Sequence, residues 1–179
     1  AKAADVVILC LGEHYLQTGE ATSRTELSLP ENQMELFCAV KTVNPNVAVV
    51  LFNGHPLLLD ELSRNAAAIL QAWLPGTEGG HAILDLLTGT KNPSGKLPMT
   101  FPRNMGQIPI YYNHFSTGRP LTGTDPQRFV SKYTDTPNTP LFPFGYGLSY
   151  AEFSYSDVSL SSDSLTSEDS ITASVQLKN

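Results

Sequence analysis

Three short apolar runs divide the first half of the chain, and polar stretches separate them. They cover residues 6–11, 47–52 and 67–73, and each is rich in Val, Ile, Leu or Ala. None shows the alternation of apolar and polar residues that is typical of a half-buried strand. Continuous apolar runs of this length indicate parallel strands that are covered on both faces. We therefore predict three such strands.

Helical patterns lie between and after these runs. Pro30 suits the first turn of one helix, which Asn44 and the proline after it should end. A short helix is predicted over 57–64, and another begins with Thr77 as N-cap and ends at Gly89. The alternation of strands and helices predicts an α/β fold, a mostly parallel sheet between helices. The apolar residues on the inner faces of the first and third helices are Leu36, Phe37, Val40, Val43, Ile83, Leu86 and Leu87.

The second half of the chain has a different texture. Prolines interrupt it from residue 92 onward, so that only residues 96–101 allow one more strand before a long aromatic segment ends at residue 150. The tail is rich in Ser and alternates over 171–177, which predicts the opening strands of a β-sandwich. A sandwich needs more strands than 151–179 can hold. We expect an α/β domain at 1–150 that lacks its first strands, a truncated second domain at 151–179, and thus a piece of a longer protein.

Composition and charge exclude several classes of partner. The 179 residues are 41% hydrophobic and 16% charged, as in a folded domain, and the net charge of −6 argues against a nucleic-acid partner. No apolar run approaches the roughly 18 residues of a membrane span, and the first residues lack the pattern of a signal peptide, as those of a mature exported protein would. Cys10 and Cys38 are predicted to be small buried hydrophobic residues, without a disulfide or metal-ligand spacing.

Candidate chemistry gathers on the polar loop that leaves the first apolar run. In open α/β sheets, ligands bind where loops emerge from the carboxyl ends of the strands. This loop carries Glu13, His14, Glu20 and Arg24 within residues 12–24. One of its two glutamates is our candidate for a proton donor. A charged loop residue is, however, more commonly a solvated surface group, so the residues alone leave both interpretations open.

The neighbouring side chains also have two interpretations each. Glu13 lies nearer the strand end, and we favour a structural carboxylate that bonds backbone amides or pairs with Arg24. Arg24 could orient Glu20 or bond a sugar hydroxyl with its fork of donors, and the alternative is an ordinary surface arginine. Trp73, at the end of the third run, could stack on a sugar face or pack against a neighbour.

Two other kinds of site find little support. His14 and His55 lie near serines in the sequence, but the Gly-x-Ser-x-Gly motif of many serine hydrolases is absent. No two His or Cys residues stand at a spacing typical of metal ligands. We therefore expect neither a serine nucleophile, nor a metal, nor another cofactor.

Seven motifs, in this order, carry a resemblance to a known family. They are Leu-Gly-Glu (11–13), Gly-Glu-Ala-Thr-Ser-Arg (19–24), Leu-Ser-Leu-Pro (27–30), Asn-Gly-His-Pro-Leu (53–57), Trp-Leu-Pro-Gly-Thr-Glu-Gly-Gly (73–80), Asn-Pro-Ser-Gly-Lys-Leu-Pro-Met-Thr-Phe-Pro (92–102) and Phe-Gly-Tyr-Gly-Leu-Ser-Tyr (144–150). Together they resemble the C-terminal domain of glycoside hydrolase family 3, and most nearly that of bacterial periplasmic β-glucosidases. Residues 107–120 support that subgroup, and the tail resembles the start of the fibronectin-III-like domain that follows in such enzymes.

The resemblance implies a part of a retaining β-glucosidase that needs no cofactor. In the family, a (β/α)₈ barrel carries the aspartate nucleophile and most of the sugar pocket, and the second domain lends the acid/base glutamate. The matching position is Glu20, within Gly-Glu-Ala-Thr-Ser-Arg. Implied partners are a β-linked oligosaccharide or aryl glucoside, the barrel, and in some cases a second copy of the chain. The implied location is periplasmic or secreted.

Alternatives stay open at this point. The chain could be a non-catalytic module that contacts carbohydrate, or it could serve a sister specificity such as that of a β-xylosidase or exo-glucanase. The proline-rich segment 107–150 is best explained as a wrapper that docks on the barrel, since its aromatic residues would otherwise form a large exposed patch. These are Tyr111, Tyr112, Phe115, Phe142, Phe144 and Tyr146.

Overall fold

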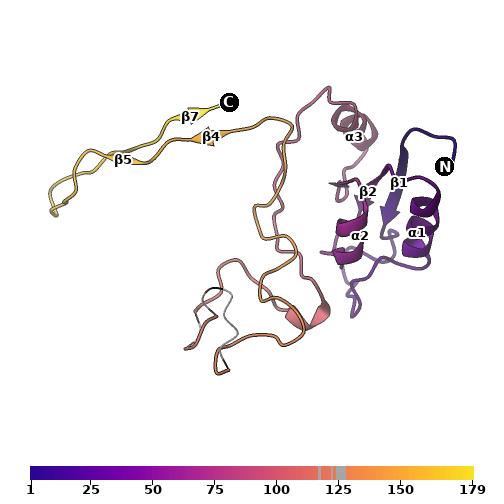
Figure 1. Cartoon of the computed structure of the whole chain (residues 1–179), viewed down its shortest axis with the longest axis horizontal. Helices are drawn as coiled ribbons and strands as arrows, with labels where there is room; N and C mark the ends of the chain where they lie inside the picture. The colour runs from indigo at the N-terminus through magenta and orange to yellow at the C-terminus, as the bar shows by residue number, and fades with distance from the viewer. Residues whose placement is uncertain (117, 122, 124–127) are drawn as a thin grey trace.

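A parallel sheet forms the centre of the N-terminal half (Figure 1). The computed structural model describes residues 1–116, 118–121, 123 and 128–179. In these residues the sheet has the strand order β1-β2-β3, with every neighbouring pair parallel. Its strands are β1 (Val7–Gly12), β2 (Val47–Phe52) and β3 (Ala68–Gln71). The predicted parallel α/β fold is therefore confirmed, and β2 has the bounds expected from its apolar run.

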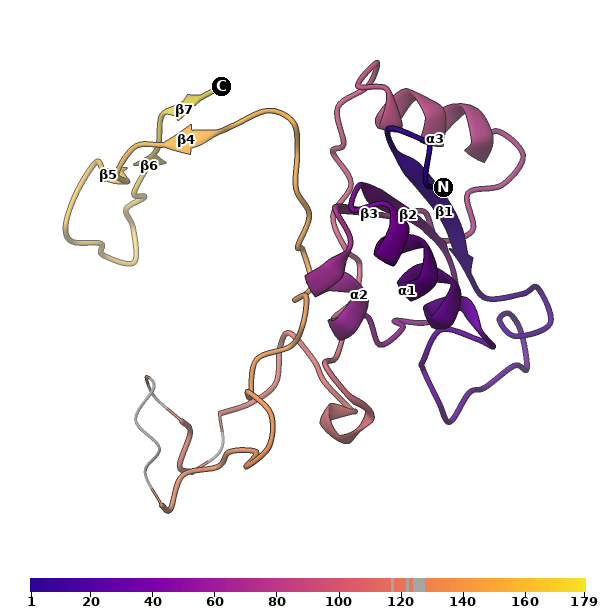
Figure 2. The same ribbon diagram turned by 45° about the vertical axis from the view of Figure 1, so that its right-hand side comes forward.

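Helices lie on both sides of this sheet. They are α1 (Gln33–Val43), α2 (Asp60–Asn65) and α3 (Gly79–Leu87). Figure 2 shows α1 and α2 on one side of the sheet and α3 on the other. α1 and α2 each connect one strand to its parallel neighbour, which places both on the same side when the crossovers have the usual hand. The last helix begins one residue later than predicted, with Glu78 rather than Thr77 as its N-cap.

The core lies between the sheet and the first two helices. Val49 and Leu51 of β2 point into it and are almost completely buried, as are Phe37 of α1 and Leu62 of α2. Of the stripe predicted for α1, Phe37 is buried, but Leu36 and Val43 are about half exposed. The stripe is therefore narrower than predicted, because the sheet under α1 has few strands.

The edge strand β1 departs from the prediction of strands covered on both faces. Leu11 belongs to the core, whereas Ile8, on the opposite face, is 49% exposed. Cys10 shares that outer face and is exposed, and Cys38 is exposed on α1. The prediction that both cysteines are buried is wrong. Cys10 is exposed because the outer face of β1 is incompletely covered, and Cys38 is exposed because it lies on the solvent side of α1.

The segment after α3 contains less regular structure than predicted. The strand expected over 96–101 is wrong, because only an isolated bridge from Phe101 to Phe142 forms there. A short 3₁₀ helix, η1 (Met105–Gln107), follows. Prolines on both sides of Phe101 remove the amide donors that a longer ladder would need.

The tail forms a long two-stranded ribbon that projects away from the sheet (Figures 1 and 2). It consists of β4 (Ser154–Tyr155) paired with β7 (Leu177–Lys178), and β5 (Ser159–Leu160) paired with β6 (Ala173–Ser174), both antiparallel. Residues of all four strands are exposed. Isolated ribbons of this kind are marginal in water.

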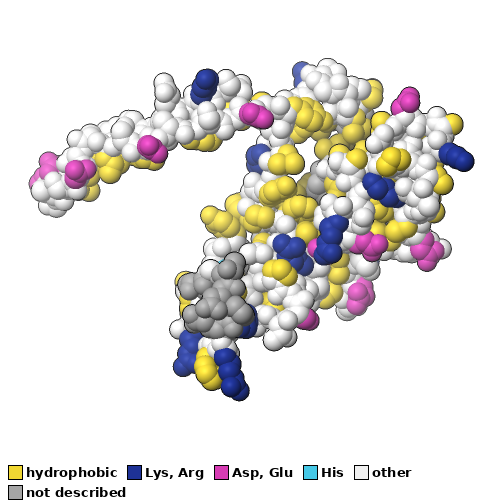
Figure 3. Space-filling view, in the orientation of Figure 1, with side chains coloured by type: hydrophobic (Ala, Val, Ile, Leu, Met, Phe, Trp, Pro, Cys, Tyr) yellow, Lys and Arg dark blue, Asp and Glu magenta, His cyan; other side chains and the backbone are white. Residues whose placement is uncertain are grey.

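Apolar side chains also stand exposed on the proline-rich segment, which hangs below the sheet in Figure 1. The space-filling view shows yellow groups scattered over the face between this segment and the sheet (Figure 3). Phe115 is 94% exposed, whereas Phe142 is half-buried against the core and stacks on Tyr146. The other exposed aromatic residues of this segment named above are Tyr111, Tyr112, Phe144 and Tyr146.

We expect truncation of the central strand to destabilise the fold much more than truncation of an exposed leucine. Leu51→Ala removes a fully buried side chain and should cost about 2–5 kcal/mol of unfolding free energy. Leu84→Ala in α3, where the side chain is 57% exposed, should cost less than about 1 kcal/mol. Denaturant unfolding of the protein that contains this chain measures both. If both substitutions lowered the unfolding free energy equally, the core described above would be wrong.

Candidate active site

Polar side chains meet where the three strands end. Glu13 follows β1, Asn53 follows β2, and Gln71 is the last residue of β3. Gln71 Nε2 donates to Asn53 Oδ1 at 2.9 Å, and Asn53 Nδ2 donates to the carbonyl of His55 at 2.6 Å. Gly12 allows β1 to lie close to β2 here, since its φ is +142° and a Cβ would stand 1.8 Å from the Phe52 carbonyl oxygen.

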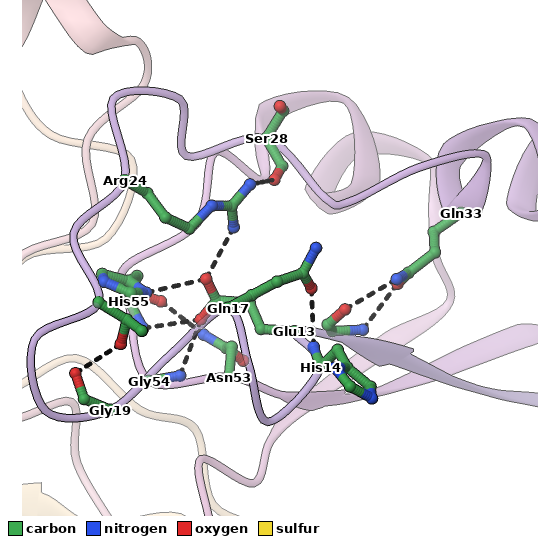
Figure 4. Close-up of polar contacts among 12 residues, drawn as sticks. Glu13, His14, Gln17, Gly19, Arg24, Ser28, Gln33, Asn53, Gly54 and His55 are labelled. Atoms are coloured by element: carbon green, nitrogen blue, oxygen red, sulfur yellow. Dashed lines mark hydrogen bonds and ion pairs between the residues drawn. The ribbon is translucent and has the colours of Figure 1, made fainter.

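The carboxylate of Glu13 is the centre of this region (Figure 4). Its side chain has no exposed surface. Oε1 accepts a hydrogen bond from Arg24 Nη1 at 2.7 Å and lies 2.8 Å from His55 Nδ1. Oε2 accepts from the amides of Gly54 at 3.0 Å and His55 at 3.1 Å. We call Glu13, Arg24, Gly54 and His55 the Glu13 cluster. Both contacts expected of a structural Glu13, with amides and with Arg24, are present.

These contacts decide the charge of Glu13. Burial alone would raise the pKa of the carboxyl, because the charged form loses its hydration. The hydrogen bonds from Arg24, from the amides of His55 and Gly54, and from the His55 ring act in the opposite direction. Together they hold the pKa of Glu13 below its usual value. The group is therefore a buried carboxylate at neutral pH, which does not fit a general acid.

Arg24 joins Glu13 to the far end of the loop. Its Nη2 donates to the carbonyl of Ser28 at 3.0 Å, while Nη1 binds Glu13. The guanidinium is largely buried, with 17% of the side chain exposed. Arg24 therefore orients Glu13 and the loop backbone, and it is connected to Glu20 only through the chain between them.

Glu20 stands at the tip of the same loop and is exposed. The residues on both sides of it have positive φ, +129° at Gly19 and +58° at Ala21. The turn is supported by Thr22, whose hydroxyl donates to the Gly19 carbonyl at 2.6 Å. A non-glycine residue with positive φ is uncommon and costs free energy, and such residues cluster at functional sites. The backbone thus turns sharply at both neighbours of Glu20.

The other predicted residues lie farther from this tip or in different roles. His14 is exposed, and its amide bonds the side chain of Gln17. Trp73 is half-buried and packs against Phe101, with 5.7 Å between the ring centroids. Trp73 therefore packs against a neighbour in the structure, and its role in stacking on a sugar stays a prediction.

Sequence reasoning missed three members of the region. His55 was considered only for a serine-hydrolase site, whereas it faces Glu13. Asn53 and Gln71 were not singled out as polar groups. The available signal was the Asn-Gly-His-Pro motif directly after β2, whose strand end lies beside that of β1 in a parallel sheet. Within the described residues, the one buried side-chain nitrogen or oxygen without a partner is Gln71 Oε1.

The described residues contain little that points to another kind of site. No group of three or more His, Cys, Asp or Glu is arranged to hold a metal ion there. No helix among them is both long enough and apolar enough to cross a bilayer. One surface hollow is lined by Thr100, Tyr112 and Pro143, among others, and thus lies in the proline-rich segment.

Comparisons with known proteins give the family. Residues 1–150 match the glycosyl hydrolase family 3 C-terminal domain. A periplasmic β-glucosidase of Salmonella typhimurium is 49% identical over all 179 residues, and a β-xylosidase of Formosa agariphila is 38% identical. The crystal structure of a Listeria innocua β-glucosidase superposes with a TM-score of 0.85 at 50% identity, over 89% of this chain.

The fold and the matched residues define a domain of a glycoside hydrolase. The chain belongs to glycosyl hydrolase family 3, to whose C-terminal domain residues 1–150 correspond. It spans 23% of the length of the Salmonella protein and 22% of that of the Listeria protein.

The low pKa of Glu13 predicts an acid-dependent loss of stability. A group whose pKa is lowered by folding stabilises the fold above its unfolded pKa, near 4.5, and this contribution is lost as the pH falls through the folded value. We expect the unfolding free energy to fall below about pH 4.5 more steeply in the wild type than in Glu13→Gln. Denaturant midpoints across the acid range measure this, with Glu26→Gln as an exposed control. Identical pH slopes in wild type and Glu13→Gln would count against the assignment.

Proposed function

We propose that this chain supplies the acid/base residue, Glu20, of a retaining β-glucosidase whose nucleophile lies outside residues 1–179. One observation carries the proposal above all. Glu20 is presented outward on a loop whose base is fixed at the strand ends, in a chain 49% identical to a periplasmic β-glucosidase. The family match over 1–150 supports the reaction class.

The proposed reaction needs two carboxyl groups about 5 Å apart. In the first step, an external aspartate bonds to the anomeric carbon while the bond to the leaving oxygen breaks and Glu20 gives that oxygen its proton. In the second step, Glu20 takes a proton from a water molecule, whose oxygen bonds to the anomeric carbon as the aspartate departs. Glu20 thus begins and ends the cycle protonated, and no cofactor takes part.

Glu20 has no dry environment of its own, because it is exposed in this chain. A glycosidase acid that works near neutral pH needs a partly desolvated site. We infer that a barrel domain covers the tip and supplies that environment. The exposed aromatic side chains of the proline-rich segment, such as Tyr112 and Phe115, support a large contact with another domain. They would dock on the barrel.

The finer proposals follow the same relatives. The substrate would be a β-linked oligosaccharide or an aryl glucoside, and the name of the Salmonella relative supports a periplasmic or secreted location. Because a β-xylosidase of Formosa agariphila is also a relative, a related specificity such as that of a β-xylosidase is the second candidate. We also propose that residues 1–150 form one domain and that 151–179 begin a fibronectin-III-like domain, as the exposed ribbon of β4–β7 suggests.

Loss of the Glu20 proton should matter most for poor leaving groups. In the complete protein, Glu20→Gln should lower kcat/KM by about 10²–10⁴-fold on an alkyl or disaccharide glucoside. The loss should be much smaller on an activated aryl glucoside, whose leaving oxygen departs without a proton. Steady-state kinetics on both substrates measure the difference.

Glu26→Gln is the matched control, because Glu26 is an exposed glutamate near the same loop. It should leave both rates close to those of the wild type. An equal loss on the two substrates in Glu20→Gln would remove Glu20 from the acid role.

The 179-residue chain alone should not hydrolyse p-nitrophenyl β-glucoside. The proposal places the second carboxylate elsewhere, and a lone exposed glutamate cannot form the covalent intermediate and protonate the leaving group together. A chromogenic assay of the isolated chain at high concentration measures this, with the complete protein as positive control. Turnover that disappears in Glu20→Gln would overturn the division of the site. Sugar binding without turnover would favour a carbohydrate-contacting module.

A further inference from the structure

We propose that Glu13 is a positioning residue for Glu20. Its buried carboxylate fixes the base of the loop, and the direction of the Glu20 carboxyl depends on that charge. The inference rests on the proposed role of Glu20 and adds a residue that need not touch the substrate.

The Glu13 cluster closes the loop at its base. Glu13 stands at the beginning of the loop, and Arg24, eleven positions later, returns to bind it at 2.7 Å. Arg24 then continues to the Ser28 carbonyl. Glu20 lies between Glu13 and Arg24 in the sequence, so that both ends of its segment are fixed through one carboxylate.

A second contact is steric. Gly54 donates its amide hydrogen to Glu13, and it also faces Thr18, two residues before Glu20. A Cβ added at Gly54 would lie 2.1 Å from Thr18 Oγ1. The loop therefore lies directly on the segment that follows β2, and no side chain fits between the two.

The backbone next to Glu20 also needs support from its surroundings. Gly19 adopts its positive φ freely, but the positive φ of Ala21 is maintained only when the surrounding structure determines it. Besides the turn bonded by Thr22 and the hydrogen bonds between Gln17 and His14, this part of the loop is held by the Glu13 cluster and by the contact of Thr18 with Gly54. If these are loosened, the turn is expected to relax and the carboxyl of Glu20 to swing.

The four contacts of Glu13 require a carboxylate, and an uncharged side chain of the same size does not preserve them. Two ring or guanidinium N–H groups and two backbone amides all point at its two oxygens. Glutamine offers one acceptor oxygen, and its NH₂ group would face two of these donors. Glu13→Gln therefore breaks about half of the contacts while it keeps the size of the side chain.

The test uses the complete protein and a substrate with a poor leaving group. Glu13→Gln should lower kcat by about 10–100-fold, the range found when residues behind a reacting group are removed, with a small change in KM. In Glu20→Gln, where no acid remains to be positioned, adding Glu13→Gln should lower kcat by less than about threefold. Rates on an activated aryl glucoside and the thermal midpoint of each variant show whether the protein is folded.

Arg64→Gln is the matched control, because Arg64 pairs with Asp60 on the exposed side of α2. It should leave kcat unchanged on both substrates. If Glu13→Gln lowers kcat by the same factor in the wild type and in Glu20→Gln, or by the same factor on both substrates, Glu13 is only structural and the inference is wrong. If Glu20→Gln has no special effect on poor leaving groups, the proposed function fails as well.

A second set of variants works even if Glu13→Gln does not fold. Gly54→Ala adds one methyl group against Thr18 and leaves every charge in place. It should lower kcat on the poor leaving group, and Thr18→Ala in the same protein should restore most of that loss by removing the clashing hydroxyl. If Gly54→Ala does not lower kcat, or if Thr18→Ala does not restore it, the segment after β2 does not position Glu20 and the inference is wrong.

Discussion

A buried negative charge sets the geometry of this site. The Glu13 side chain has no contact with water, and an unpaired carboxylate in such a place would cost several kcal/mol. Donors from two separate segments meet that requirement, namely Arg24 of the loop and the adjacent residues Gly54 and His55 after β2. Because all of them must reach the same two oxygens, the loop, the strand ends and the following segment have little freedom to move relative to each other.

The two glutamates of the loop thus have opposite environments. Glu13 is dry, saturated with donors and held ionised, whereas Glu20 is wet and stands at the tip of a sharp turn. An acid/base residue needs the reverse of what Glu13 has, since it must be able to carry a proton. The separation of roles has a simple physical basis, in which one carboxylate organises the base of the loop and the other is free to meet a partner surface.

The sequence predicted the elements well and their surroundings less well. The pattern of apolar and polar residues located β2 and α1, because the formation of both elements depends mainly on residues that are close together in the sequence. It failed for Ile8 and Cys10, because exposure on β1 depends on what covers the sheet edge. Proline placement could have excluded the strand at 96–101. The contacts of Glu13 with Arg24 and with amides were expected, but His55 was not placed beside it, since they are 42 positions apart.

The most direct test is a structure of the complete protein with a substrate analogue in its site. We predict that the Glu20 carboxyl lies about 5 Å from a carboxylate contributed from outside residues 1–179, as a retaining mechanism requires. We also predict that the Glu13 contacts are unchanged at the base of the loop. A Glu20 that points into solvent, with no second carboxylate near the bound analogue, would contradict the account.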